Sequence, residues 1–154
     1  MKNPTRRDID HFKKAILMDY NRLILDKADC NGRLFEIEDQ INSMFGVKGV
    51  HYGGIPGSSD PHYKELKRLG LIDKSKKIEQ KLAKIDQKIA IIDTFCRFAD
   101  TKISEAAFRI YCLETSTYKQ EAENMFISES TLKRKINQEI YNFLKVDTQS
   151  TFFL

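Results

Sequence analysis

The stretch that decides the fold is residues 104–144, SEAAFRIYCLETSTYKQEAENMFISESTLKRKINQEIYNFL. It predicts a helix that begins after Ser128, because a serine hydroxyl at that position can accept a hydrogen bond from a backbone N–H of the first turn. Glu129 follows, where the positive end of the helix dipole favours an acid. The apolar residues of this helix recur three and four positions apart, at Leu132, Ile136, Ile140 and Phe143.

A shorter helix is predicted just before it. Thr117 followed by Gln120 has the pattern of a capping box, which opens a helix. Ala122 is small enough to let a second helix approach closely, and Phe126 and Ile127 are expected to anchor the turn with apolar contacts. Two helices joined in this way are typical of a helix-turn-helix, which places its second helix in the major groove of DNA.

The polar side of the second helix carries the residues expected to contact DNA. Lys133, Arg134 and Asn137 are expected to read bases, because Arg and Lys match the acceptors of guanine and Asn matches adenine. Lys119 and Lys135 are expected to hold phosphates, and two hydroxyl residues support the helix start. The expected DNA-binding residues are Lys119, Ser130, Thr131, Lys133, Arg134, Lys135 and Asn137.

A structural role is the alternative for the same pattern. Two amphipathic helices with a tight turn also build an ordinary helical core, so the spacing alone leaves both readings open. From residue 104 to the end there are six Lys and Arg against seven Asp and Glu. Only residues 133–135 concentrate positive charge. Phosphate contacts are therefore expected from that run, from Lys119, from helix N-termini or from another part of the chain.

Two long helices are predicted upstream, over about 8–45 and 62–98, each with an apolar seam in a heptad register. The first seam comprises Tyr20, Leu23, Lys27, Cys30, Leu34, Ile37, Ile41 and Met44, and Ile9, Phe12 and Ile16 extend it backward with one irregular step. The second seam comprises Leu71, Ser75, Ile78, Leu82, Ile85, Ile89, Ile92 and Cys96. Two such helices either fold back as an antiparallel coiled-coil hairpin or pair across a dimer.

A connector and a tail complete the predicted organisation. Residues 46–61 hold five of the seven glycines and two of the three prolines, which predicts a loop. The loop matches no phosphate-binding motif and is expected to act as a connector or to touch DNA or a partner. The apolar end 152–154 is expected to dock on the core or on a second subunit. The expected fold is all-α, with the helical pair in 1–99, the helix-turn-helix in 100–145 and a tail in 146–154.

Composition and charge limit the classes of protein to which the chain can belong. The chain has 154 residues, 31% of them charged, and a formal charge of +4, which is compatible with nucleic acid but not specific for it. Between residues 62 and 102 there are eleven basic and six acidic residues, which indicates either a solvated lysine face or a surface that follows DNA backbone. No stretch approaches the roughly 20 apolar residues that a membrane span needs.

The residues that would carry chemistry are scattered. Cys30, Cys96 and Cys112 are odd in number and widely spaced, so they are expected to be reduced core residues in a cytoplasm. His11, His51 and His62 lie outside any metal-ligand spacing, and none stands in a nucleophile motif. We therefore expect no enzyme activity, no metal and no cofactor.

Tyr111, residues 117–122 (TYKQEA) and residues 126–128 (FIS) resemble the C-terminal helix-turn-helix of phage late-gene transcriptional regulators of the ArpU and RinA type. In that family the unit looks like the promoter-reading region of bacterial sigma factors. The order of long helix, glycine-containing loop, second long helix and terminal unit is similar across most of the chain. The chain departs from the family pattern at Glu121, where isoleucine is typical, and at Ile110, where arginine is common.

The resemblance implies a sequence-specific activator of phage packaging and morphogenesis genes in the host bacterial cytoplasm. Its implied partners are double-stranded promoter DNA and the host RNA polymerase, and the long helices offer a route to a homo-oligomer. Two alternatives remain open at this point. One is a DNA-packaging protein similar to a small terminase subunit, which also joins a helix-turn-helix to a coiled coil. The other is a coiled-coil adaptor that does not bind DNA.

Overall fold

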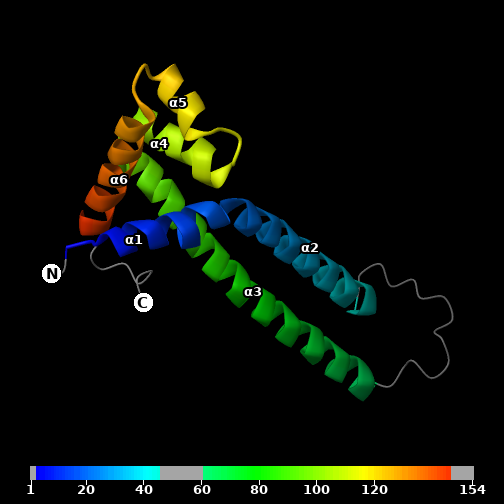
Figure 1. Cartoon of the computed structure of the whole chain (residues 1–154). Coiled ribbons are helices and arrows are strands. Elements are labelled where there is room, and N and C mark those ends of the chain that lie inside the picture. Colours follow the sequence, from blue (N-terminus) through cyan, green and yellow to red (C-terminus); the bar gives the residue numbers. More distant parts are fainter. Residues whose placement is uncertain (1–2, 46–60, 147–154) are drawn as a thin grey trace. The chain divides into compact units, whose positions relative to one another are not determined.

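The computed structural model describes residues 3–45 and 61–146, and the regular elements of these two ranges are all helices, which confirms the predicted fold class (Figure 1). Most of the predicted connector, and the apolar end 152–154, lie outside the described residues. Pro61, which was assigned to the connector, instead opens a helix. Proline suits that position because the first residue of a helix has no N–H partner to lose.

The helices in chain order are α1 (Arg6–His11), α2 (Tyr20–Phe45), α3 (Pro61–Phe98), α4 (Thr101–Ala107), α5 (Tyr118–Asn124) and α6 (Glu129–Val146). Three short turns of other helical types complete the described elements: a π-helical turn Phe12–Ile16, a 3-10 turn Leu17–Asp19 and a second π-helical turn Phe108–Cys112. The chain divides into two compact units. Unit 1 contains Met1–Ile24 and Gln87–Leu154, and unit 2 contains Leu25–Asp86.

The single helix predicted over residues 8–45 is interrupted, so that expectation is wrong in its first third. α1 ends at His11, and the π-helical and 3-10 turns separate it from α2. A π-helical turn accommodates one extra residue and so changes which side chains face inward. As a result Phe12, Ile16 and Leu17 are all buried. The irregular step in the predicted seam falls in this segment.

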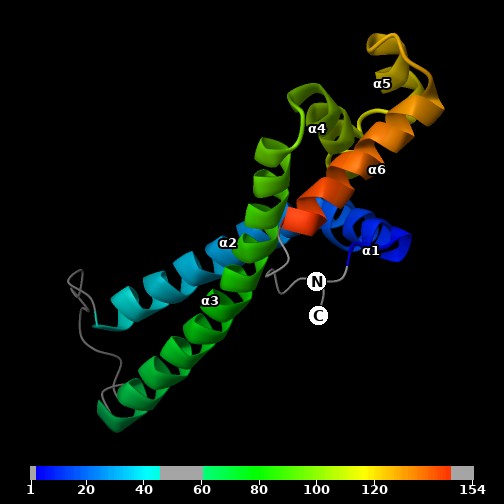
Figure 2. The same ribbon diagram turned by 90° about the vertical axis from the view of Figure 1, so that its left-hand side faces the viewer.

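The core of unit 1 is built from segments that are far apart in the sequence. Phe12, Phe95 of α3 and Phe143 of α6 form an aromatic cluster with ring centroids 5.4 to 5.7 Å apart. The predicted apolar stripe of α6 is buried, with Leu132 and Ile136 fully inaccessible. In both views α1 lies beside α6 (Figures 1 and 2), and the two helices are in contact. The predicted domain boundary at residue 99 therefore falls inside this unit.

Unit 2 contains parts of α2 and α3, and the predicted helix over 62–98 is confirmed as α3. Lys27 of α2 forms an ion pair with Asp86 of α3, with 2.9 Å between Nζ and Oδ1. Of the seam residues in this unit, Cys30, Leu71 and Ile85 are buried, and the others that the structure describes are half-buried. Large apolar side chains elsewhere on unit 2 are more than half exposed, namely Leu25, Phe35, Tyr63, Leu66 and Leu69.

Candidate nucleic-acid interface

α5 begins at the predicted capping box. The Thr117 side chain accepts a hydrogen bond from the Gln120 N–H, and the Gln120 side chain accepts one from the Thr117 N–H, both at 3.2 Å. These two bonds satisfy donors that a helix start otherwise leaves unpaired. Ala122 is 2% exposed, and α5 is in contact with α6. The burial of this small residue is consistent with the predicted close approach of the two helices.

The turn after α5 is closed by two backbone hydrogen bonds. The Ile127 N–H donates to the Ala122 carbonyl at 3.0 Å, and the Phe126 N–H donates to the Glu123 carbonyl at 3.1 Å. This pair of bonds defines a Schellman motif, in which the residue after the helix cap adopts the left-handed conformation that glycine prefers. Here that residue is Phe126, with φ of 59°.

Phe126 does not anchor the turn, so that prediction is wrong. Its side chain is 95% exposed. Ile127, which follows it, is half-buried and occupies the position whose side chain commonly makes the apolar contact of a Schellman motif. The sequence pattern could not distinguish the two, since both are large and apolar.

α6 begins at the predicted cap, Ser128. Its Oγ accepts a hydrogen bond from the Thr131 N–H at 3.2 Å. The same Oγ lies 2.7 Å from Oγ1 of Thr131 and 3.2 Å from Oγ of Ser130. Three hydroxyl groups therefore gather at the N-terminus of an 18-residue helix, where the dipole is positive.

The outer face of α6, formed by Ser130, Arg134, Asn137 and Tyr141, is open only in its N-terminal half. Ser130 and Arg134 are exposed, whereas Asn137 and Tyr141 are half-buried. The Oδ1 atom of Asn137 is buried and has no hydrogen-bond partner within the described residues. Asn137 is therefore not placed to offer this oxygen to a base, although the sequence predicted it as a base reader.

The three lysines expected in the site lie in different surroundings. Nζ of Lys133 lies 5.0 Å from the ring centroid of Tyr118, so this side chain folds back over α5 in a cation–π contact. Lys119 is exposed on α5. Lys135 points to another side of α6 and lines a groove with Asp100 and Glu139. The predicted residues at the start of α6 therefore lie close together, whereas Lys135 lies on a different side of the helix.

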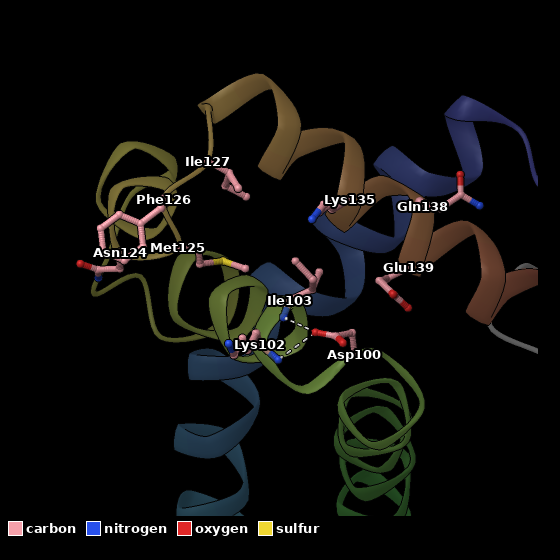
Figure 3. Close-up of a pocket in the computed structure, with 10 residues that line it drawn as sticks. All are labelled: Asp100, Lys102, Ile103, Asn124, Met125, Phe126, Ile127, Lys135, Gln138 and Glu139. Atoms are coloured by element: carbon pink, nitrogen blue, oxygen red, sulfur yellow. Dashed lines mark hydrogen bonds between the residues drawn. The ribbon is translucent and has the colours of Figure 1, made fainter.

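This groove lies between the start of α4, the turn after α5 and α6 (Figure 3). Asp100 caps α4 there, since its Oδ1 accepts hydrogen bonds from the N–H groups of Lys102 and Ile103. The groove carries charges of both signs, since Lys102, Lys135, Asp100 and Glu139 are all among its lining residues. Such a balance does not favour a phosphate over any other group.

An ion pair that the sequence analysis did not find links the second π-helical turn to α5. Nε and Nη2 of Arg109 donate to the two carboxylate oxygens of Glu121, at 2.6 and 2.9 Å. The Glu121 side chain is only 3% exposed, whereas that of Arg109 is 43% exposed. The hydrogen bonds from Arg109 hold the pKa of the Glu121 carboxyl below its usual value, against the effect of burial.

The sequence contained a signal for this pair. The resemblance stated above gives an expectation of isoleucine at the position of Glu121, and isoleucine is typical of a core position. A buried carboxylate requires a cation and hydrogen-bond donors, so its partner had to be sought among nearby basic residues. Arg109, twelve residues before Glu121, supplies it.

A second unexpected arrangement brings the N-terminal segment to this site. Nζ of Lys13, in the first π-helical turn, lies 5.7 Å from the ring centroid of Tyr111. Tyr111 packs edge-to-face on Tyr118 at 5.8 Å, and Tyr118 carries Lys133 on its ring. Lys13, Tyr111, Tyr118 and Lys133 therefore form a continuous stack. The sequence placed Lys13 in a long helix of a separate domain, so it could not anticipate this contact.

Comparisons with protein-family models, curated proteins and solved structures found no match for this chain. No group of three or more His, Cys, Asp or Glu in the two described ranges is arranged to hold a metal ion. The helices that the structure describes include none whose apolar stretch is long enough to traverse a bilayer. The function is therefore inferred from α5, α6 and the residues around them.

Proposed function

We propose that this chain is a sequence-specific DNA-binding transcriptional regulator, in which α5, the turn and α6 act as a helix-turn-helix and α6 enters the major groove. The observation that carries the proposal is the open N-terminal half of α6, where Ser130, Lys133 and Arg134 are exposed directly after a capped turn. In this class of protein the first residues of the second helix reach the base edges. The N-terminal half of α6, which has to reach the bases in this proposal, is therefore the half whose outer side chains are exposed.

The packing around the turn supports the same conclusion. Ala122 is buried where α5 meets α6, and the Schellman motif fixes a tight connection between the two helices. α4 also contacts α6, which gives the three-helix unit common in proteins that carry a helix-turn-helix. In this arrangement Arg134 reads a base, with guanine as its best partner. Ser130, Lys119 and the α6 N-terminus contact phosphates.

The long helices are proposed to form an antiparallel hairpin in unit 2 that joins two copies of the chain. The ion pair between Lys27 and Asp86 and the burial of Cys30, Leu71 and Ile85 support the hairpin. The exposed side chains of Leu25, Phe35 and Leu66 support association with a second copy, because a monomer gains nothing from leaving them in water. A symmetric dimer would present two α6 helices to two half-sites.

The resemblance to ArpU and RinA regulators supports activation of phage late genes in a bacterial cytoplasm, with the host RNA polymerase as a protein partner. In this proposal the chain is a regulator and has no catalytic site. A packaging protein similar to a small terminase subunit and an adaptor that does not bind DNA are the two outcomes that would replace it.

The test is a selection of bound fragments from random duplex DNA with the full chain, followed by titration of the best fragment. We expect Arg134→Ala to weaken binding by about 1 to 3 kcal/mol and to relax one position of the selected sequence. Lys145→Ala is the matched control, because Lys145 is exposed in the last turn of the same helix. It should leave the selected sequence unchanged.

Two results would contradict the proposal. Absence of any DNA retardation at low salt, where even nonspecific electrostatic binding is strong, would favour the adaptor. Ring assembly in light scattering, with no effect on a reporter driven by a late promoter, would favour the packaging protein. An Arg134→Ala variant with unchanged affinity and sequence preference would remove Arg134 from the proposed role.

A further inference from the structure

The proposed interface is short of positive charge on the residues that the sequence assigned to it. The chain from residue 104 to the end carries six basic and seven acidic residues. Lys135 lines a groove with Asp100 and Glu139, and so lies beside acids. DNA affinity comes largely from phosphate contacts, so a binding unit needs cations beside the helix that enters the groove. The structure supplies such a cation from the N-terminal segment, which the sequence did not assign to the interface.

Lys13 is that cation. It lies in the π-helical turn Phe12–Ile16, and its Nζ is held over Tyr111, 5.7 Å from the ring centroid. Through Tyr111 and Tyr118 it is joined to Lys133 of α6. The neighbouring Phe12 is 1% exposed in the aromatic core, so the position of this turn is fixed by packing.

Neither Lys13 nor Lys133 forms an ion pair within the described residues, and Asp10 is the acidic residue that acts on Lys13. Burial lowers the pKa of Lys13, the nearby charge of Asp10 raises it, and the charges of Arg6 and Lys133 lower it by smaller amounts. The Lys13 ammonium is thus close enough to Lys133 to feel its charge. An anion placed beside them would relieve this repulsion.

We propose that Lys13, from the π-helical turn, and Lys133, from α6, form one contact surface for the DNA backbone beside the open half of α6. This inference rests on the proposed DNA-binding function and extends it to a segment far away in the sequence. Lys133, whose side chain folds back over Tyr118, then holds a phosphate and does not read a base. The first 24 residues become part of the DNA-binding unit.

The experiment measures DNA binding of the full chain as a function of salt, with a mixed-sequence DNA duplex as the probe. Each phosphate contact contributes about 0.9 to the slope of log affinity against log salt. Lys13→Gln should therefore reduce the slope by about one, and Lys133→Gln should do the same. Lys13→Arg keeps the charge and should keep the slope of the parent.

Lys14→Gln is the matched control, because it removes the same charge from the next residue. Lys14 is exposed, whereas Lys13 is half-buried against Tyr111. It should lower the slope less than Lys13→Gln does. An equal effect of the two variants would show that net charge alone acts, and would overturn the two-lysine contact.

The remaining outcomes separate this inference from the function on which it rests. If the parent chain does not bind the duplex at low salt, the proposed function fails. If the parent binds and both Lys13→Gln and Lys133→Gln keep its slope, the function stands and this inference is overturned. Thermal melting followed by circular dichroism shows whether Lys13→Gln folds. If Lys13→Gln does not fold, the inference is tested with Lys133→Gln, which changes an exposed residue, through its slope of log affinity against log salt.

Discussion

In unit 1 the side chains of Phe12, Phe95 and Phe143 are at most 3% exposed, whereas in unit 2 Phe35 is 71% exposed and Leu25 70%. Both units contain helices with the same kind of apolar spacing. The difference arises because unit 1 collects distant segments of the chain around one aromatic cluster, whereas the described residues of unit 2 belong to two helices, α2 and α3. Apolar periodicity thus predicts which side of a helix is buried, but not how completely.

The largest expected effect comes from breaking the aromatic cluster. Phe12→Ala should destabilise unit 1 by about 3 to 5 kcal/mol, because it leaves a cavity between Phe95 and Phe143 and releases the N-terminal segment. At a protein concentration low enough to keep the chain monomeric, Phe35→Ala in unit 2 should change the stability by less than about 0.5 kcal/mol, since that ring then lies in water. Denaturant unfolding of the two variants measures both losses of stability. Equal losses would contradict the difference in burial between the two units.

Replacing one or the other partner of the Arg109–Glu121 ion pair should have unequal effects on the stability of unit 1. Arg109→Met leaves the Glu121 carboxylate buried without a partner, so we expect a loss of about 3 kcal/mol. Glu121→Ile should cost less than about 1 kcal/mol, because Arg109 is 43% exposed and can reach water, and the buried position suits an apolar residue. Chemical unfolding at neutral pH gives both values. A larger loss for Glu121→Ile than for Arg109→Met would contradict the inferred arrangement.

The same ion pair makes the free energy of unfolding depend on pH in the acid range. The folded-state pKa of Glu121 is lowered by its hydrogen bonds from Arg109, so its contribution to stability is complete above the unfolded value of 4.5. That contribution is lost as the pH falls from 4.5 through the lower folded value. Glu121→Gln should therefore show a smaller decrease in unfolding free energy over this range than the parent. Urea melts at successive pH values compare the two proteins, and parallel curves would exclude the effect.

The smallest expected effect is a gain. Phe126 adopts a left-handed conformation that costs an L-residue about 1 to 2 kcal/mol, and its exposed ring contributes no burial in return. Glycine avoids this cost but loses more conformational entropy on folding. Phe126→Gly should therefore stabilise unit 1 by about 0.5 to 1 kcal/mol. Thermal melting tests this, and a decrease in stability would show that the ring makes contacts that its exposure does not reveal.

Much of the fold could be predicted from local patterns. The caps at Thr117 and Ser128, the buried stripe of α6 and the extent of α3 depend on residues within a few positions of one another. Hydroxyl side chains and apolar spacing determine such features directly. The exposed Arg134 at the start of α6 was also foreseeable, because it lies opposite the buried stripe.

The rest depended on contacts between distant segments. The π-helical turn at Phe12 changes the register of the first helix, and no residue type marks such a turn. The pairing of Arg109 with Glu121 spans twelve residues, and the stack from Lys13 to Lys133 spans most of the chain. The burial of the Asn137 oxygen follows from the same tertiary packing. These features decide which lysines and amides of the candidate interface are available.

Unit 1 is assembled from the first and last parts of the chain, and this has a consequence for synthesis in the cell. Phe12 leaves the ribosome well before α6, so it acquires its partner Phe143 only after the long intervening part of the chain has been made. Until then Phe12, Ile16 and Leu17 are nascent apolar residues without their final cover, a condition in which chains associate wrongly or engage chaperones. A chain that terminates before α6 is therefore expected to be a substrate for proteases, with its N-terminal segment cleaved early.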